Sequence, residues 1–230
     1  MSRGLALLER AISYTRGSLV LVTPEDLTRP TPCAAWDLRA LLAHMDDSLA
    51  ALSEAADVGE VGPPGPLPRD RPSHPEGPGD GRAGENDMGT PSAPSTPGTR
   101  PGGVPPGRAP GRLVPEVDVL RRRACRLLGA WTWAGEEGAV TVGGCSVTAM
   151  TVAAVGAIEI AVHGWDVARA CGRDRPLPAA LAEELLEFAP LFVADDDRPH
   201  RFGPRVAVVA DADPGDRLLA FLGRRPAEPV

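Results

Sequence analysis

Two side chains of metal-binding type stand four residues apart in the apolar segment AIEIAVHGWDVARA, residues 157–170. They are Glu159 and His163, and they share one face of a predicted helix because residues four apart lie one turn above each other. Apolar neighbours on the same side place the pair on or beside the core-facing stripe. A carboxylate there is costly without a partner, so it binds a proton, a cation or a metal ion. The alternative for Glu159 is an ion pair with an arginine.

A third candidate ligand lies in an earlier helical segment. His44 is placed among apolar residues such as Leu41 and Met45, and alone it is typical of a core histidine with one hydrogen-bonded nitrogen. With Glu159 and His163 it completes a set of two histidines and one glutamate drawn from two helices. Three protein ligands with one open position are typical of catalytic zinc, and the open position takes a water or a thiol and lowers its pKa.

Hydrophobic spacing predicts the helices that position these residues. Asp37 is expected to cap the second helix and Thr148 the fourth, with Gly172 just past the end of the fourth. The four principal helices are predicted at residues 3–22, 37–52, 115–131 and 148–171. Smaller elements are expected as a strand pair within 132–148, turning at Gly138 or Gly143-Gly144, a helix at 178–193, a strand at 205–211 and a helix at 214–224.

Four principal helices with a long connection after the second predict a mainly α fold, a four-helix bundle over residues 1–176. Residues 177–230 are expected to form a small C-terminal α/β extension. Residues 59–112 interrupt the bundle; about half of them are Pro or Gly, and they show no hydrophobic periodicity. Such a stretch buries too little apolar surface to offset its ordering entropy, so we expect a long disordered insertion.

Composition narrows the classes of function. The formal net charge of −7 argues against nucleic acid or an anionic membrane surface as a partner. The absence of lysine excludes Schiff-base chemistry and a P-loop lysine. No uncharged apolar run reaches the length of a membrane span, and Glu9 and Arg10 interrupt the first apolar run, so no signal peptide and a cytoplasmic location are expected. The cysteines form no C-x-x-C pair and are expected to be free packing thiols: Cys33, Cys125, Cys145 and Cys171.

Three blocks of the sequence resemble those of a known superfamily. TPCAAWDLRALLAHM (31–45) and AIEIAVHGWDVARACG (157–172) are similar to the signature blocks of the DinB-like superfamily. They are closest to its actinobacterial branch, the mycothiol-dependent maleylpyruvate isomerase-like proteins. The segment FGPRVAVVADADPGDRLLAFLGRRP (202–226) resembles the tail of that branch. The resemblance covers most of the chain outside residues 59–112, where the family's loop is usually much shorter.

The resemblance implies a DinB-like four-helix bundle that holds a divalent metal, usually zinc, with three side chains. The family's ligands fall here on His44, Glu159 and His163. It also implies that a low-molecular-weight thiol such as mycothiol binds the metal as a thiolate and attacks a small electrophile, giving isomerisation or S-transfer. The expected partners are therefore a small-molecule substrate and a thiol.

Other residues of the blocks have two interpretations each. Asp166 lies about one turn beyond His163 and could accept a proton from its free ring nitrogen. The alternative for Asp166 is a surface acid paired with Arg169 or Arg39. Cys33 belongs to the first block and is therefore near the predicted site.

Three candidates for substrate or thiol binding complete the set. Trp36 and Trp165 flank the blocks, as walls of a binding pocket or as packing residues. Arg39 could meet an anionic substrate or a carboxylate of the thiol, or form a salt bridge between helices.

The sequence leaves several functions open. The first hypothesis is a metal-dependent thiol transferase or isomerase. A metal-dependent hydrolase or lyase that uses water and no thiol fits the same ligands, as does a non-catalytic binding protein. A purely structural bundle requires His44 and His163 to be core histidines without a metal. The oligomeric state, monomer or homodimer, is also open.

Overall fold

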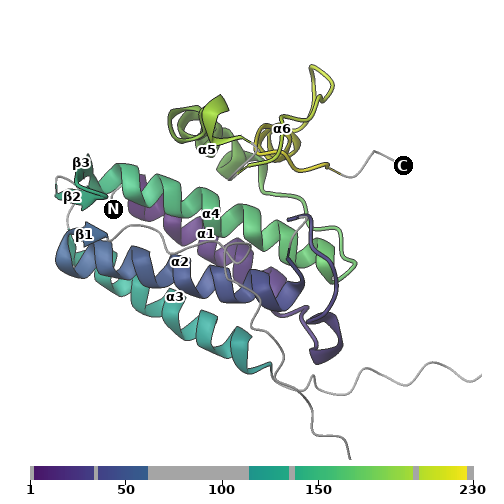
Figure 1. Cartoon of the computed structure of the whole chain (residues 1–230), viewed down its shortest axis with the longest axis horizontal. Helices are drawn as coiled ribbons and strands as arrows, with labels where there is room; N and C mark the ends of the chain where they lie inside the picture. Colours follow the sequence, from purple (N-terminus) through teal and green to yellow (C-terminus); the bar gives the residue numbers. More distant parts are fainter. Residues whose placement is uncertain (1–2, 34–35, 62–113, 135–137, 199–201, 227–230) are drawn as a thin grey trace, which may run out of the picture. The chain divides into compact units, whose positions relative to one another are not determined.

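The structure is a computed structural model that describes residues 3–33, 36–61, 114–134, 138–198 and 202–226 (Figure 1). The predicted insertion at 59–112 lies outside the described residues, except for its first three. Those three are ordered: Gly59 ends a helix with a left-handed φ of 71°, and Glu60–Val61 is a short strand. The prediction of disorder is therefore wrong for these three residues.

Four long helices build the bundle: α1 (Arg3–Leu19), α2 (Leu38–Val58), α3 (Pro115–Ala134) and α4 (Ala149–Ala170). Helix α1 packs mainly along α4, and α2 packs along both α3 and α4 (Figure 1). The mainly α, DinB-like bundle predicted from the sequence is confirmed. Helix α1 ends at Leu19, three residues before the predicted end.

Helix α4 is the core helix of the bundle. Most of its residues are buried, and the less buried positions include Thr151, Val155 and Glu159, which are spaced four apart and so share one face. Of the helices described, α4 alone has the length and apolar composition of a membrane span, and 78% of that span is buried inside the protein. Burial of this extent is typical of a core helix in a bundle.

The contact between α1 and α4 requires a glycine. A Cβ atom added to Gly164 would lie 2.3 Å from the hydroxyl oxygen of Thr15. That hydroxyl donates a hydrogen bond of 2.7 Å to the carbonyl oxygen of Ile160. Gly164 therefore allows the two helices to approach at the level of the neighbouring His163.

The helix ends follow the predicted caps. The side chain of Asp37 accepts a hydrogen bond of 2.8 Å from the amide of Ala40 at the start of α2. Thr148 accepts one of 3.2 Å from the amide of Thr151 at the start of α4. Gly172 follows α4 with a φ of 67°, as a C-terminal glycine does.

A small sheet closes one end of the bundle. Its strands are β1 (Glu60–Val61), β2 (Ala139–Val142) and β3 (Cys145–Thr148), in the order β1-β2-β3. Strands β2 and β3 are antiparallel, while β1 and β2 are parallel. The two residues between β2 and β3, Gly143 and Gly144, both have positive φ, so the turn falls at the second of the two predicted places.

The C-terminal part is helical. Helices α5 (Ala179–Phe192) and α6 (Pro214–Phe221) pack against each other, and short 3₁₀ turns occur at Pro24–Asp26 and Asp195–Asp197. The predicted strand at 205–211 is wrong: this segment is irregular, and the amide of Val206 donates to the carbonyl of Ala220 in α6. Val209 is 70% exposed. The valines of this segment favour a β-strand, but no described strand lies beside it to pair with. Without such pairing, β propensity has little effect on the conformation.

Candidate metal centre

The structure brings together the three predicted ligands, His44 from α2 and Glu159 and His163 from α4. The Nε2 atom of His163 lies 3.0 Å from Oε2 of Glu159, and Nε2 of His44 lies 3.8 Å from the same oxygen. All three donor atoms lie within 4.8 Å of one another. Two helices that pack side by side thus converge three donors on one point.

The exposure of the three side chains differs. His163 is nearly buried, at 8% exposure, whereas His44 is 24% and Glu159 33% exposed. Glu159 lies on the less buried face of α4, so its carboxylate meets solvent while His163 is enclosed. The site is therefore enclosed on the His163 side and accessible on the Glu159 side.

The donor set fits a divalent metal such as zinc. Tetrahedral Zn²⁺ with nitrogen and oxygen ligands about 2.0–2.2 Å away needs donors about 3.3–3.6 Å apart. The observed separations of 3.0 and 3.8 Å fall on either side of that range. Two imidazoles, one carboxylate and an accessible side are also the donor set of many catalytic zinc sites.

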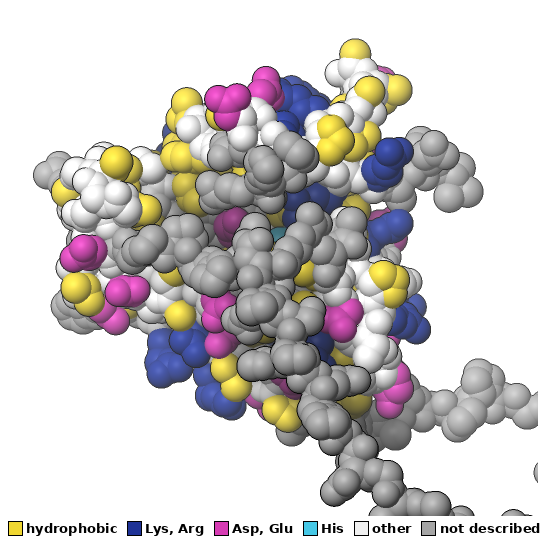
Figure 2. Space-filling view, in the orientation of Figure 1, with side chains coloured by type: hydrophobic (Ala, Val, Ile, Leu, Met, Phe, Trp, Pro, Cys, Tyr) yellow, Lys and Arg dark blue, Asp and Glu magenta, His cyan; other side chains and the backbone are white. Residues whose placement is uncertain are grey.

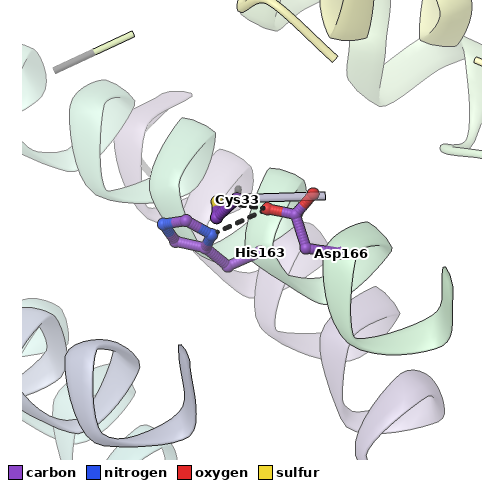
Figure 3. Close-up of side chains that lie close together, drawn as sticks. All are labelled: Cys33, His163 and Asp166. Atoms are coloured by element: carbon purple, nitrogen blue, oxygen red, sulfur yellow. Dashed lines mark hydrogen bonds and ion pairs between the residues drawn. The ribbon is translucent and has the colours of Figure 1, made fainter. Parts of the chain in front are cut away.

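Asp166 is hydrogen-bonded to Nδ1, the second ring nitrogen of His163 (Figure 3). Its Oδ2 lies 2.9 Å from Nδ1 of His163, and the carboxylate is fully buried. When Nδ1 of His163 donates a hydrogen bond to Asp166, Nε2 is the ring nitrogen that faces Glu159 and His44 and is the one that could bind a metal ion. The predicted orienting contact of Asp166 with His163 is therefore present in the structure.

Arg224 is a site residue that the sequence analysis missed. It follows α6, and its guanidinium donates to both carboxylate oxygens of Asp166, at 3.0 Å from Nη2 and 3.4 Å from Nε. The alternative for Asp166, a surface acid paired with Arg169 or Arg39, is wrong, because the carboxylate is buried and pairs with Arg224. The signal that could have found it is the tail resemblance at 202–226, since Arg224 lies within that block.

Cys33 completes this buried cluster. Its Sγ atom lies 3.4 Å from Oδ2 of Asp166 and accepts a hydrogen bond of 3.1 Å from Nη2 of Arg224. Figure 3 shows Cys33 beside His163 and Asp166. Cys33 is therefore part of the site and more than a packing thiol. All four cysteines are free as predicted, but Cys125 and Cys145 are exposed, so the packing role predicted for these two is wrong.

The charges of the cluster stabilise one another. Burial alone raises the pKa of Glu159, but hydrogen bonds and positive charge from His163 and His44 outweigh it and bring that pKa well below its usual range. Burial also raises the pKa of Asp166, and the charge of Arg224 and the hydrogen bond with His163 bring it below the ordinary value. Both carboxylates are thus held in the ionised form that a metal centre needs.

His163 and Arg224 show the complementary effect. Burial lowers the pKa of His163, but hydrogen bonds with Asp166, Cys33 and Glu159 raise it well above the usual value. Burial also lowers the pKa of Arg224, and the charge of Asp166 reverses that shift. A cation at the Nε2 side of His163 would therefore replace a proton in surroundings already arranged for positive charge.

A second group of possible ligands overlaps the first. Cys33, His163 and Asp166 also lie within ligand distance of one another. In that group, however, Nδ1 of His163 is already hydrogen-bonded to Asp166, and Arg224 binds both Asp166 and Cys33. The guanidinium supplies the positive charge there and would repel a metal ion. The electrostatics favour the set of His44, Glu159 and His163.

The three weaker candidates have distinct surroundings. The ring of Trp36 lies against His44, with 4.5 Å between ring centroids, so it covers one side of that ligand. Trp165 is 3% exposed and belongs to the hydrophobic core, which supports its packing role. Arg39 forms an ion pair of 2.6 Å with Glu116 of α3, the interhelical salt bridge that was its alternative role.

Comparison with known proteins gives one match. Residues 8–168 match the family model described as the mycothiol maleylpyruvate isomerase N-terminal domain. The chain belongs to this family. The matched region holds α2 and nearly all of α4, and with them His44, Glu159 and His163, whereas Arg224 lies beyond it. No curated protein and no solved structure matches the chain.

Proposed function

We propose that this chain is a metal-dependent enzyme that activates a low-molecular-weight thiol, such as mycothiol, for S-transfer to a small electrophilic metabolite or for its isomerisation. The observation that carries the proposal is the convergence of the His44, Glu159 and His163 donors beside an accessible face. Membership of the mycothiol maleylpyruvate isomerase family supports the thiol. We take the metal to be zinc because the donors are two imidazoles and one carboxylate.

In this proposal His44, Glu159 and His163 hold the metal. A bound divalent metal supplies one kind of chemistry here: it lowers the pKa of a contacting thiol, so that the thiolate nucleophile is present at neutral pH. Asp166 fixes the tautomer of His163 by accepting a hydrogen bond from its Nδ1–H group. The charge of Arg224 keeps Asp166 ionised, so the proton stays on Nδ1.

The surroundings of the ligands also suit a nucleophile. Trp36 covers His44 on one side and reduces the access of water to it. Glu159 is 33% exposed, so a substrate can approach its carboxylate from solvent. We propose a cytoplasmic location and one compact metal-binding bundle over residues 1–176, with 177–230 as an extension that contributes Arg224.

The test is turnover of an electrophilic substrate with and without thiol. Zinc-loaded protein is mixed with maleylpyruvate, and loss of substrate is followed with mycothiol, with a different small thiol and with none. The proposal predicts turnover that requires a thiol and falls at least 100-fold in His163→Gln. Turnover that is equal without thiol would indicate a hydrolase or lyase that uses water. Metal binding without turnover of this or any other electrophile tried would favour a binding protein.

A further inference from the structure

The two histidine ligands are supported in different ways. Nδ1 of His163 is hydrogen-bonded to Asp166 at 2.9 Å, and such a bond fixes the ring orientation of a metal-binding histidine. Within the described residues, Nδ1 of His44 has no such partner, and the one polar contact of this ring joins Nε2 to Glu159. The terminal torsion of a histidine side chain is broad, so the ring needs a second support. A contact other than a hydrogen bond must therefore set the orientation of His44.

Two aromatic rings lie against the ring of His44. The indole of Trp36 is 4.5 Å away between centroids, at an interplanar angle of 45°, and the ring of His163 is 5.0 Å away, at 86°. Trp36 also packs against the hydrophobic core. His44 is 24% exposed, and Figure 2 shows histidine (cyan) at the surface of the face viewed. Burial alone therefore does not hold this ring, and Trp36 is the neighbour placed to do so.

The backbone of Trp36 is fixed on both sides. Its amide donates a hydrogen bond of 2.8 Å to the carbonyl of Cys33. Its carbonyl accepts two hydrogen bonds from the buried Thr31, one of 3.2 Å from the amide and one of 2.9 Å from the hydroxyl. The next residue, Asp37, caps α2. Trp36 is therefore also fixed relative to the helix that carries His44.

We propose that Trp36 is a positioning residue for His44 and that Thr31 holds Trp36 in place for this role. The flat face of the indole limits rotation of the imidazole, so that Nε2 stays directed toward Glu159. Ring packing thus does for this ligand what a hydrogen bond does for the other histidine. The inference rests on the proposed function in taking His44 as a metal ligand. It goes beyond covering that ligand from water, because it requires a flat ring at position 36 and not merely an apolar side chain.

Zinc affinity of variants at position 36 tests this inference without turnover. Trp36→Phe keeps a flat ring, whereas Trp36→Leu keeps an apolar side chain without one. In competition with a coloured chelator, Trp36→Phe should stay within about threefold of the unaltered protein and Trp36→Leu should bind about 10–100-fold more weakly, as when the support of a histidine ligand is lost. Cobalt(II) in place of zinc gives a second readout. Its visible absorption bands depend on ligand geometry, so they should change in Trp36→Leu and not in Trp36→Phe.

Two further variants separate positioning from stability. Thr31→Val removes the hydroxyl that bonds the backbone of Trp36, so zinc affinity should fall in the same direction as in Trp36→Leu. Trp131 is a buried tryptophan of α3 whose Nε1 donates a hydrogen bond of 3.2 Å to the carbonyl of Leu52. Trp131→Phe, the control, should lower the melting temperature and leave zinc affinity and the cobalt bands unchanged.

Three results would overturn the inference. Equal zinc affinity in Trp36→Phe and Trp36→Leu would show that a flat ring is not required. Unchanged cobalt bands in Trp36→Leu would show that Trp36 does not set the ligand geometry. Unchanged zinc affinity in Thr31→Val would remove the role of Thr31. In each case zinc binding by the unaltered protein leaves the metal centre intact, whereas folded, unaltered protein without zinc would overturn the metal centre together with this inference.

Discussion

Nη2 of Arg224 lies 3.0 Å from Oδ2 of Asp166, although 58 residues separate them in the chain. This contact joins the segment after α6 to the core helix of the bundle. Asp166 is fully buried, and Arg224 is nearly so. The same oxygen of Asp166 contacts Nδ1 of His163, so the C-terminal segment acts on the candidate metal ligands through one carboxylate.

Loss of Arg224 should destabilise the fold. Arg224→Met removes the cationic partner and leaves a buried carboxylate, which costs about 3 kcal/mol. Urea unfolding of the metal-free protein measures this free energy. In the double variant Arg224→Met/Asp166→Asn the destabilisation should be well below the sum of the two single changes, because the unpaired charge is gone. An unchanged urea midpoint for Arg224→Met would show that the contact contributes nothing.

Asp166 should also tune metal affinity. Asp166→Asn keeps the size of the side chain but removes the charge that holds the Nδ1 proton of His163. We expect zinc affinity to fall about 10–100-fold, as for other changes behind a histidine ligand. Competition with a coloured chelator measures it. Asp174→Asn, at an exposed position, is the matched control, and equal zinc affinity in both variants would remove Asp166 from the site.

Gly164 should tolerate no side chain, while Gly129 should. Gly164→Ala places a Cβ atom against Thr15, so overpacking should cost about 1–3 kcal/mol. Gly129 lies in α3 with nothing within 4 Å of an added Cβ, so Gly129→Ala should stabilise the helix by about 0.5–1 kcal/mol. Thermal unfolding of the two variants should move in opposite directions; a shared direction would contradict the close approach of α1 and α4.

Tyr14 should lose its phenolic proton at a higher pH than an exposed tyrosine does. Its hydroxyl donates to the carbonyl of Arg175 at 2.6 Å, and burial raises the pKa of Tyr14 to about 12. It is the chain's one tyrosine, so the ultraviolet absorbance of phenolate reports it directly. The unfolded chain loses this proton from about pH 10 and the native state only near pH 12, so the unfolding free energy should fall between these values. Tyr14→Phe should lack this contribution, and a phenolate midpoint near 10 would contradict the burial.

Much of the fold could be predicted from local patterns. The spacing of apolar residues located the four helices, and Asp37, Thr148 and Gly172 marked their ends, because capping is a local interaction. Helix ends differed by up to six residues: α2 continues to Val58, past the predicted end at residue 52, and stops at Gly59. The prediction of a strand at 205–211 is wrong because a strand depends on a distant interaction. It requires a partner strand, and the valines of this segment do not reveal whether a partner is present.

The residues of the candidate site also fall into those that a local pattern predicts and those that it does not. Glu159 and His163 could be paired from their spacing in one helix, and His44 joined them as a histidine among apolar residues. The contacts of Cys33 and Arg224 with Asp166 depend on how distant segments pack, which no local pattern contains.

Metal content tests the central claim most directly. Protein purified without an affinity metal is offered zinc, dialysed and analysed for bound metal, beside His44→Ala, His163→Ala and the exposed control Glu183→Ala. The account predicts about one zinc per chain in the unaltered protein and in the control, and loss of zinc in both histidine variants while most of the helicity is kept. No zinc in the folded, unaltered protein, or full zinc in both histidine variants, would contradict it.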